Sequence, residues 1–341
     1  MESVVETAAE LPLNLLRWMD RDKAGAERPH SKSSMDWDST YIEGVIMAAL
    51  TEDVGPGDMA VAATVASGKT VLASVVTGRE LVCAGLPLAG KALKRLDPEI
   101  SVEIKESEGE PVPSGATLAK LNGNAGAILS GQQTVLNFLS HLCGIATNTR
   151  NYVDAISGTN ARIRDSLNTT PGMRLLEQYA VRMGGGAYSR AGLFDAIVLT
   201  QAHIGAAGGI KAALDQAHSH ASRLMNPLPL TAYEATGTVP AEMEAASLPI
   251  QLAIQNQAEL REALSAGAES ILLEDMQAEQ VRRLVEVARN IRNDCVLEVA
   301  GEIPLEQAME YAATGVDYIA PRGLTRSAAL ADLRMLVDGW E

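Results

Sequence analysis

Aromatic residues and cysteines are scarce in this sequence of 341 residues. Phe, Trp and Tyr make up only 4% of the chain, so its hydrophobic cores must consist mainly of Ala, Leu, Val and Ile. The three cysteines, Cys83, Cys143 and Cys295, lie far apart in the sequence and form no Cys-x-x-Cys pair. This spacing disfavours a metal cluster or a disulfide framework. We therefore expect buried apolar cysteines and a reducing, cytoplasmic location.

Long apolar runs and a surplus of basic residues are also absent. No stretch approaches the length that spans a bilayer, and the N-terminus lacks the pattern of a secretory signal. The 28 Lys and Arg residues are outnumbered by 43 Asp and Glu residues, which gives a formal net charge of -15. We therefore expect no membrane and no nucleic acid as partners, because a phosphate backbone requires a basic face. A small-molecule ligand that is anionic stays compatible with this charge, since a few local arginines can outweigh it.

The pattern along the chain divides it into four segments. Residues 1–36 combine a short apolar stretch with a polar run, which indicates an N-terminal extension. Residues 37–157 hold strand-like runs between Gly- and Pro-rich turns, which indicate a small sheet with tight loops, followed by two helices near 125–141 and 144–157. Residues 158–322 alternate strands with helices, which predicts parallel βαβ units in an α/β barrel. We expect residues 323–341 to form a C-terminal helix that returns to the N-terminal domain.

The predicted barrel strands indicate where chemistry should be sought. A closed barrel places its functional groups at the C-terminal ends of its strands. The candidate strands are Ala161–Arg164, Ala196–Leu199, Ile250–Ile254, Ser270–Leu273, Val296–Val299 and Tyr318–Ala320. The residues that follow each strand are therefore the candidate site.

Six motifs, in order along the chain, resemble the nicotinate-nucleotide pyrophosphorylase (carboxylating), or quinolinate phosphoribosyltransferase, family. They are Ala49-Leu-Thr-Glu-Asp-Val-Gly-Pro-Gly-Asp58, Val135-Leu-Asn-Phe-Leu139, Gly144-Ile-Ala-Thr147, Thr170-Pro-Gly-Met-Arg174, Tyr179-Ala-Val-Arg-Met-Gly-Gly-Gly186 and Thr314-Gly-Val-Asp-Tyr318. The resemblance implies an N-terminal α/β sandwich, an irregular parallel α/β barrel, and a homodimer in which the N-terminal domain completes the neighbour's site. In that family, quinolinate reacts with phosphoribosyl pyrophosphate and then loses carbon dioxide. Magnesium is implied only if phosphoribosyl pyrophosphate is used, and we expect no other cofactor.

The cationic positions of that family are altered in this chain. Its Asp-Thr-Arg-Lys-Thr run reads Asp165-Ser-Leu-Asn-Thr169 here, so Leu167 and Asn168 replace an Arg and a Lys. A further Lys reads Thr200, and the Arg that the family lends across the dimer aligns with Gln133. Dianionic quinolinate and phosphoribosyl pyrophosphate both need positioned cations, because an unpaired anion in a dry cleft is unfavourable. These replacements predict poor quinolinate turnover.

Other ligand positions are altered or kept. The family's Glu-Val-Glu strand reads Gln251-Leu-Ala253, its Asp-Asn pair reads Glu274-Asp275, and its Ser-Gly-Gly loop reads Ala300-Gly301-Glu302. The last phosphate loop gains Arg322. The expected site residues are Arg190, Asn168, Thr169, Thr200, Arg174, His203, Gln251, Glu274, Gly301 and Arg322, with Gln133 across the dimer and no metal ligand.

The retained residues also have structural interpretations. Arg190 is the best candidate for binding a carboxylate, and its alternative is an ion pair with Asp195. Arg174 is more typical of a charge on a helix surface or between domains, and His203 is more typical of a satisfied structural position than of an acid–base role. Thr169, Thr170 and Pro171 predict a helix N-terminus, where an anion is also favoured. Arg322 has the alternative of an ion pair with Glu302.

Three functional hypotheses remain open. The chain is a diverged enzyme for a different, less anionic small molecule, a non-catalytic binding or assembly protein, or an active quinolinate phosphoribosyltransferase of NAD biosynthesis. Between Gln216 and Pro249 it carries roughly twenty residues beyond the family pattern, which we interpret as an interface element or an extra β segment. The role of that segment near 217–249 and the ligand itself do not follow from the sequence.

Overall fold

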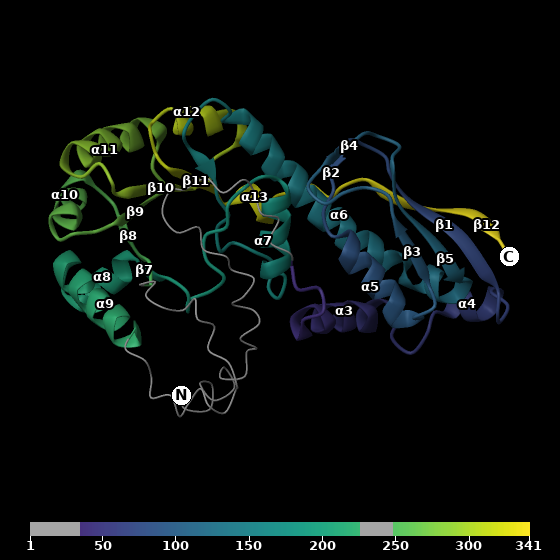
Figure 1. The fold of residues 1–341 in the computed structure, drawn as a ribbon. Coiled ribbons are helices and arrows are strands. Elements are labelled where there is room, and N and C mark those ends of the chain that lie inside the picture. Colours follow the sequence, from purple (N-terminus) through teal and green to yellow (C-terminus); the bar gives the residue numbers. More distant parts are fainter. Residues whose placement is uncertain (1–34, 226–247) are drawn as a thin grey trace. The chain divides into compact units, whose positions relative to one another are not determined.

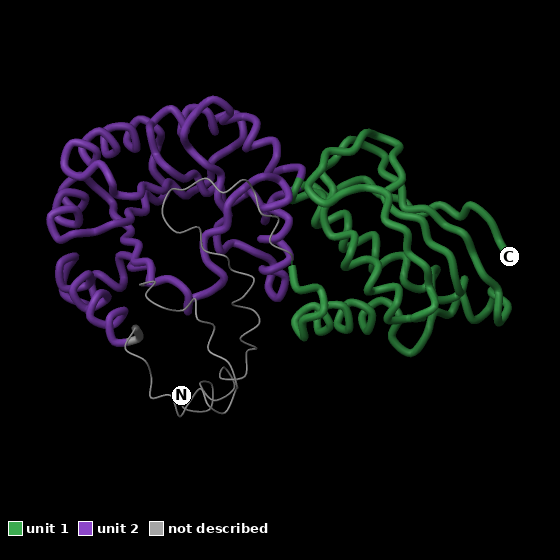
Figure 2. Tube along the Cα trace, in the orientation of Figure 1, with its two compact units in different colours: residues 1–146, 329–341 green, residues 147–328 purple. Residues whose placement is uncertain are grey.

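The computed structural model describes residues 35–225 and 248–341, which belong to two compact units (Figure 2). Of the described residues, unit 1 contains 35–146 together with Ala329–Glu341, and unit 2 contains 147–225 and 248–328. The observed boundary therefore lies inside one helix, α6 (Ala125–Ala155), and not after residue 157. Residues 1–34 and 226–247, on which the extension and most of the extra segment fall, lie outside the described residues.

Unit 1 is an antiparallel sheet with helices. Its four-stranded sheet has the order β12 (Leu333–Trp340), β1 (Thr70–Thr77), β5 (Thr117–Asn124) and β3 (Ser101–Ile104). A separate pair joins β2 (Leu81–Val82) to β4 (Pro111–Val112). The other helices of this unit are α3 (Thr40–Asp53), α4 (Met59–Thr64) and α5 (Leu86–Leu96). Alternate residues Val71, Ala73 and Val75 of β1 are buried, as expected for a strand with one face on a core.

Helix α6 is continuous, so the prediction of two helices near 125–141 and 144–157 is wrong. Gly144 does not end the helix. A Cβ atom at this position would overlap the carbonyl oxygen of Ala329, so the glycine permits a close approach of two backbones. Beside it, the backbone N–H of Ala331 donates to the carbonyl oxygen of Ser140 at 2.9 Å.

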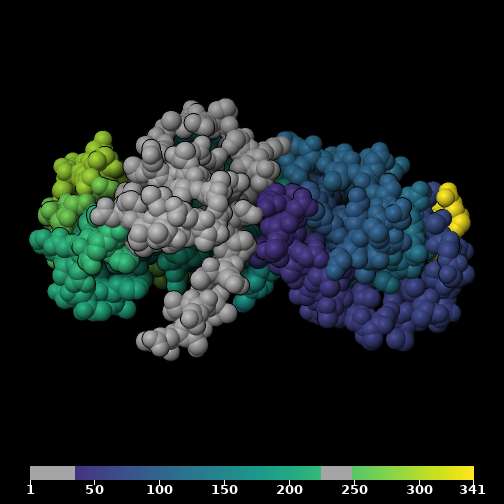
Figure 3. Space-filling model, turned by 60° about the horizontal axis from the view of Figure 1, so that its bottom comes forward, coloured from purple at the N-terminus to yellow at the C-terminus, as the bar shows by residue number. Residues whose placement is uncertain are grey.

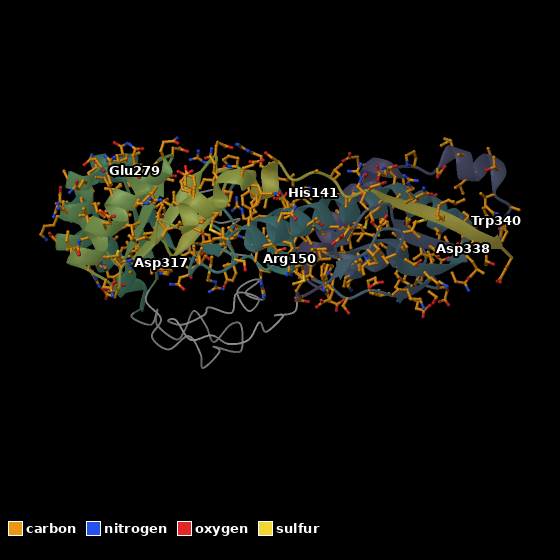
Figure 4. The ribbon with its side chains drawn as sticks, turned by 90° about the horizontal axis from the view of Figure 1, so that it is seen from above. His141, Arg150, Glu279, Asp317, Asp338 and Trp340 are labelled. Atoms are coloured by element: carbon orange, nitrogen blue, oxygen red, sulfur yellow. The ribbon has the colours of Figure 1, made fainter. Side chains whose placement is uncertain are left out.

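The predicted helix over 323–341 is also wrong. Only α13 (Gly323–Arg326) is helical, and β12 pairs antiparallel with β1 so that Val71 faces Trp340. Asp338 and Trp340 extend from β12 in Figure 4, and the end of the chain lies at the surface in Figure 3. The helix propensity of this Ala- and Leu-rich sequence is overridden by the ladder with β1, which satisfies the backbone of both strands.

Unit 2 confirms the predicted α/β class with a parallel sheet. Its six strands have the order β6 (Arg162–Ile163), β11 (Tyr318–Pro321), β10 (Val296–Gly301), β9 (Ser270–Glu274), β8 (Ile250–Ile254) and β7 (Ile197–Leu199). All neighbouring pairs are parallel, and a single bridge joins Arg164 to Ala187 beyond β6. The sheet curves inside a ring of helices (Figure 1). These helices include α8 (Gln201–Ala207), α9 (Ile210–Met225), α10 (Gln257–Ser265), α11 (Ala278–Ile291) and α12 (Ala308–Ala312), with the 3-10 helix η3 (Leu305–Gln307) before α12 and α7 (Arg174–Met183) after β6.

Small apolar residues line the inside of the curved sheet. Ala253, Leu272, Ala300 and Ala320, from four neighbouring strands, pack together as one cluster with Val198 against it. Because side chains alternate along a strand, the residues two positions earlier point to the same inner face. That earlier layer contains the polar side chains described below.

The cysteines agree with the expectation from composition. All three cysteines are buried thiols. The fold brings Cys83 and Cys143 together. The hydrogen bond between them, together with burial, raises the pKa of the Cys83 thiol. Within residues 35–225 and 248–341, no helix has both the length and the apolar character needed to cross a bilayer.

Candidate functional site

The parallel sheet of unit 2 gathers several of the predicted site residues at the C-terminal ends of its strands. Because its strands run in the same direction, their C-terminal ends lie on the same side of the sheet, and barrel enzymes bind ligands on this side. Thr200 follows β7, Glu274 ends β9, Gly301 ends β10 and Arg322 follows β11. The segment after β6 brings residues 164–170 to the same side.

A polar network lies in the inner layer beneath the small apolar residues. Nη1 of Arg164 donates to Oε2 of Glu298 at 2.7 Å, and Nε2 of Gln251 donates to the same oxygen at 3.0 Å. The Arg164 guanidinium also stacks 3.8 Å above the ring of Tyr318. Glu298 is 5% exposed and Arg164 is 21% exposed, so this is a largely buried ion pair. Gln251, a predicted ligand residue, is therefore bonded within the chain.

Neither Arg164 nor Glu298 was among the predicted site residues, although the sequence carries a signal for both. Glu298 interrupts the apolar strand Val296–Gly301 at a single position. Arg164 follows buried Ile163 at the end of β6. A charged residue inside an apolar strand must face the interior or a partner, because it has no solvated face there.

The loop after α7 is anchored to Asp165 and Gln178, both of which are fully buried. The backbone N–H of Ser189 donates to Oδ1 of Asp165. Nε2 of Gln178 donates to Oδ2 of Asp165 at 2.7 Å and to the carbonyl oxygen of Arg190 at 2.8 Å. Burial raises the pKa of Asp165 to about 7, although the two donors and the nearby Arg164 oppose this rise.

The other side of the loop is anchored by Asp195 and Arg174. Asp195 accepts hydrogen bonds from the backbone N–H groups of Ala191 and Gly192 at 3.0 and 3.1 Å. Arg174 donates from Nη1 to the carbonyl oxygen of Ala191 at 3.1 Å and from Nε to Oγ1 of Thr169 at 3.2 Å. Arg174 and Thr169, both predicted to bind the ligand, therefore bond to each other, and Arg174 also bonds to the loop.

Arg190 has a fixed backbone and an uncommitted charge. Within the described ranges, no carboxylate lies within the 4.0 Å salt-bridge distance of its guanidinium. Asp195 is thus not an ion-pair partner at that distance, which was the alternative expected from the sequence. Burial lowers the pKa of Arg190, whereas the more distant charges of Asp195 and Glu298 raise it.

His203 and Thr200 form a capping interaction at the start of α8. Nδ1 of His203 lies 3.1 Å from the backbone nitrogen of Thr200, which donates to it, and 2.8 Å from the Thr200 hydroxyl. This occupies one ring nitrogen of His203 and the hydroxyl of Thr200. His203 therefore has the structural role that the sequence offered as its alternative. Thr200 is its partner in this capping interaction.

The predicted helix N-terminus at Thr169–Pro171 is wrong. Helix α7 begins at Arg174, and its N-cap Met173 makes no side-chain cap. The N–H of Thr170 instead bonds to the buried carboxylate of Glu177 at 3.2 Å, which holds the preceding residues outside the helix. Asn168 is exposed, and its carbonyl oxygen accepts a hydrogen bond from the Thr325 hydroxyl at 2.7 Å.

The rim formed by β9, β10 and β11 is occupied by ion pairs. Nη1 and Nη2 of Arg322 donate to Oδ1 and Oδ2 of Asp275 at 2.6 and 2.9 Å. Glu274 lies 3.9 Å from the same guanidinium. The expected pair of Arg322 with Glu302 does not form, because Asp275 takes the guanidinium and Glu302 pairs with Arg326.

Gln133, the residue predicted to act across a dimer, belongs to unit 1. It is exposed on α6, and its Nε2 donates to Oδ1 of Asn137 one turn later at 2.8 Å. An amide in this position supplies hydrogen bonds and no positive charge.

The acidic residues of the rim are a poor fit for magnesium. Mg²⁺ prefers oxygen ligands in near-octahedral geometry, with carboxylates free to reach it. Asp275 and Glu302 are engaged by arginines, and the described residues contain no group of three His, Cys, Asp or Glu side chains placed to hold a metal.

Two clefts lie at the N-terminal ends of the strands of this sheet. One of about 440 Å³ is lined by residues before β6 and β11, including Arg289 and Asp317. The other, of about 280 Å³, is lined by residues before β8 and β9 together with Leu214 and His218 of α9. Neither contains a predicted site residue. Nη1 and Nη2 of Arg289 donate to Asp317 and to nearby carbonyl oxygens, so the first cleft has a structural ion pair in its wall.

Comparisons with known proteins cover nearly the whole chain. The model of the quinolinate phosphoribosyl transferase N-terminal domain matches residues 58–143, and that of the C-terminal domain matches residues 145–239 and 232–336. A probable nicotinate-nucleotide pyrophosphorylase (carboxylating) of Bacillus subtilis (strain 168) is 32% identical, over 83% of this chain and 89% of its own length. The Mycobacterium leprae (strain TN) nicotinate-nucleotide pyrophosphorylase (carboxylating) is 35% identical, over 84% of this chain and 94% of its own length.

A solved structure shows the same fold. The nicotinate-nucleotide pyrophosphorylase from Francisella tularensis superimposes with a TM-score of 0.75 at 29% identity, covering 91% of this chain and 100% of that chain. The matched domains, their order and the paired architecture of an antiparallel sheet and a parallel barrel together identify the chain. It belongs to the quinolinate phosphoribosyl transferase family.

Proposed function

We propose that the chain is a diverged member of this family that handles a small molecule with fewer anionic groups than quinolinate and phosphoribosyl pyrophosphate. On this proposal it is poor or inactive with that substrate pair. Leu167, Asn168 and Thr200 carry no positive charge at positions where the family resemblance implies cations. Each lost charge-assisted hydrogen bond removes about 1.5–3 kcal/mol of binding free energy, although such losses do not simply add.

The observation that carries the proposal is the state of the remaining cations at the strand ends. Arg164 and Arg322 are paired with carboxylates of the chain, and Arg174 is bonded to loop backbone. Arg190 is therefore the guanidinium best placed to bind an external anion. One such group suits a ligand with a single carboxylate or phosphate and does not suit a dianion with a polyphosphorylated partner.

The second candidate is a working quinolinate phosphoribosyltransferase (carboxylating). The activity for which the relatives are named and the retention of Arg190 on a rigid loop favour it. It requires other groups to replace the absent cations, and the ion pairs at Glu298 and Asp275 would have to open for Arg164 and Arg322 to do so.

Two measurements separate these candidates. Purified protein is incubated with quinolinate, phosphoribosyl pyrophosphate and Mg²⁺, and nicotinate mononucleotide and carbon dioxide are quantified against the Bacillus subtilis relative. A thermal-shift screen with quinolinate, nicotinate, phosphoribosyl pyrophosphate and pyrophosphate runs in parallel, because a ligand that binds the folded state raises its Tm. Matched formation of both products at a rate similar to the relative would reject the diverged function.

We also propose a homodimer, which the family resemblance implies. With Gln133 at the position where the family resemblance implies a cation lent across the interface, the dimer would contribute polar contacts and no charge to the shared site. Light scattering at micromolar concentration tests the assembly, and a monomer would refute it.

A further inference from the structure

Asp275 and Arg322 form a two-pronged ion pair at the C-terminal ends of β9 and β11. Both guanidinium Nη atoms donate to the two oxygens of one carboxylate, at 2.6 and 2.9 Å. The two backbones are also fixed, since the N–H of Arg322 donates to Gly301 and that of Asp275 donates to Ala300, each at 2.9 Å. The same parallel fork is how arginine binds phosphate groups.

The local backbone directs Asp275 toward this guanidinium. Asp275 has a φ of 55°, and in the described part of the chain it is the single residue other than glycine with a positive φ. Asp and Asn tolerate this left-handed conformation better than most residues do. At Gly301, a Cβ atom would lie 3.1 Å from Oδ1 of Asp275, so the absence of a side chain there leaves room for the carboxylate.

The rim as a whole carries more acid than base. Glu274 lies 3.9 Å from Arg322, and Glu302 pairs with Arg326 on the neighbouring loop. Three carboxylates therefore face two guanidinium groups. A phosphate entering this edge would meet a cation that is already neutralised and an acidic surplus around it.

We propose that Asp275 is a specificity-determining residue whose carboxylate occupies the position of a ligand phosphate at Arg322. The ligand of this barrel would accordingly carry no phosphate at the β9–β11 end, while its anionic group binds Arg190. This inference rests on the proposed function in placing the ligand at this edge. The Asp275–Arg322 ion pair itself does not depend on that function.

The test removes the carboxylate and measures binding of inorganic phosphate. Asp275→Gly suits the positive φ and deletes the side chain, and Asp275→Asn keeps the shape and loses the charge. Equilibrium dialysis with radiolabelled phosphate at low ionic strength, and the phosphate dependence of Tm, are measured for both variants and the unaltered protein. We expect phosphate affinity to rise about tenfold or more in Asp275→Gly and by less in Asp275→Asn, which retains one acceptor for Arg322.

Two double variants show which arginine is responsible for the increased phosphate affinity. Adding Arg322→Ala to Asp275→Gly should abolish the increased affinity, whereas adding Arg283→Ala, which removes an exposed arginine of α11 outside the site, should leave it unchanged. Equal affinity of the unaltered protein and Asp275→Gly would overturn the inference, and so would a gain that survives Arg322→Ala. Circular dichroism of each variant establishes that it is folded, and Asp275→Asn keeps the test decisive if the glycine variant is not.

The outcomes separate this inference from the proposed function. Nicotinate mononucleotide formation at relative-like rates would reject the proposed function without reference to Asp275. If the protein does not turn over quinolinate and Asp275→Gly does not bind phosphate more tightly than the unaltered protein, only the proposed role of Asp275 is rejected.

Discussion

The side-chain amide of Gln178 bonds at 2.8 Å to the backbone carbonyl oxygen of Arg190. The same nitrogen donates to Asp165 at 2.7 Å, so a buried residue of α7 fixes both the loop and the carboxylate beneath it. The backbone of Arg190 is thereby held before any ligand arrives, and among residues 35–225 and 248–341 no carboxylate pairs with its side chain. Such preorganisation reduces the entropy lost on binding.

The first prediction concerns ligand affinity. For the compound that raises Tm most in the screen, Arg190→Ala should weaken binding about tenfold or more, equivalent to about 1.4 kcal/mol, because no other described site guanidinium is uncommitted. Arg283→Ala, which removes an exposed arginine paired with Glu279 on α11, is the matched control. Calorimetric titration measures both variants. Unchanged affinity in Arg190→Ala would place the ligand elsewhere.

The second prediction concerns the buried pair of Arg164 and Glu298. Glu298→Ala leaves a largely buried guanidinium without its carboxylate and should lower the free energy of unfolding by about 3–5 kcal/mol. The double variant Arg164→Leu/Glu298→Leu should recover much of this loss, because it buries no unpaired charge. Urea unfolding gives both values. Asp215→Ala, which breaks the exposed pair with Lys211, serves as the control and should cost about 0–1 kcal/mol. A loss in Glu298→Ala no larger than in that control would contradict the role of the pair.

The third prediction follows from the pKa of Asp165, which burial raises from 3.8 to about 7. The folded protein binds this proton more tightly than the unfolded chain, so the contribution of Asp165 to stability is lost as pH rises through that interval. The slope is at most about 1.4 kcal/mol per pH unit, and it ends above about pH 7. Urea unfolding between about pH 5 and 8 should show a steeper decline in the natural sequence than in Asp165→Asn. Parallel profiles would show that Asp165 does not titrate in this range.

The fourth prediction compares two helical glycines of unit 1. Gly144→Ala places a Cβ atom against the carbonyl oxygen of Ala329 and should destabilise the protein by about 1–3 kcal/mol, as overpacked sites do. A Cβ atom at Gly44 in α3 would have no other atom within 4 Å. Gly44→Ala should therefore stabilise the protein by about 0.5–1 kcal/mol through helix propensity. Thermal unfolding measures both, and stabilisation by Gly144→Ala would refute the close approach.

The barrel strands were predictable because each is a short apolar run that ends in turn residues. Ile250–Ile254 matches its predicted bounds, and Ser270–Glu274 extends its prediction by one residue. Their order in the sheet follows from parallel βαβ connectivity. The placement of the candidate site residues near the strand ends was therefore accessible from sequence, whereas the role of Arg190 in binding a ligand stays a prediction.

The partners within the site were not predictable, because they depend on directions that a sequence does not encode. Asp275 reaches Arg322 only because its φ is positive, whereas the sequence places Glu302 just as plausibly beside that arginine. Arg164 and Glu298 lie 134 positions apart and meet through strand order. The C-terminal segment was misassigned for a related reason, since its helix propensity is overridden by a neighbour at the far end of the sequence.

Strand β12 has a consequence for synthesis on the ribosome. It is an edge strand of the first unit's sheet, yet it is translated after the whole of Thr147–Ala328, and its Asp338 bonds to Ser74 across 264 positions. Domains generally fold in the order in which they emerge. Strand β1 therefore has one unpaired side until the residues of unit 2 have been synthesised, and the sheet of unit 1 is completed last. During that interval β1 exposes a row of backbone donors and acceptors that nascent chains on neighbouring ribosomes can also satisfy.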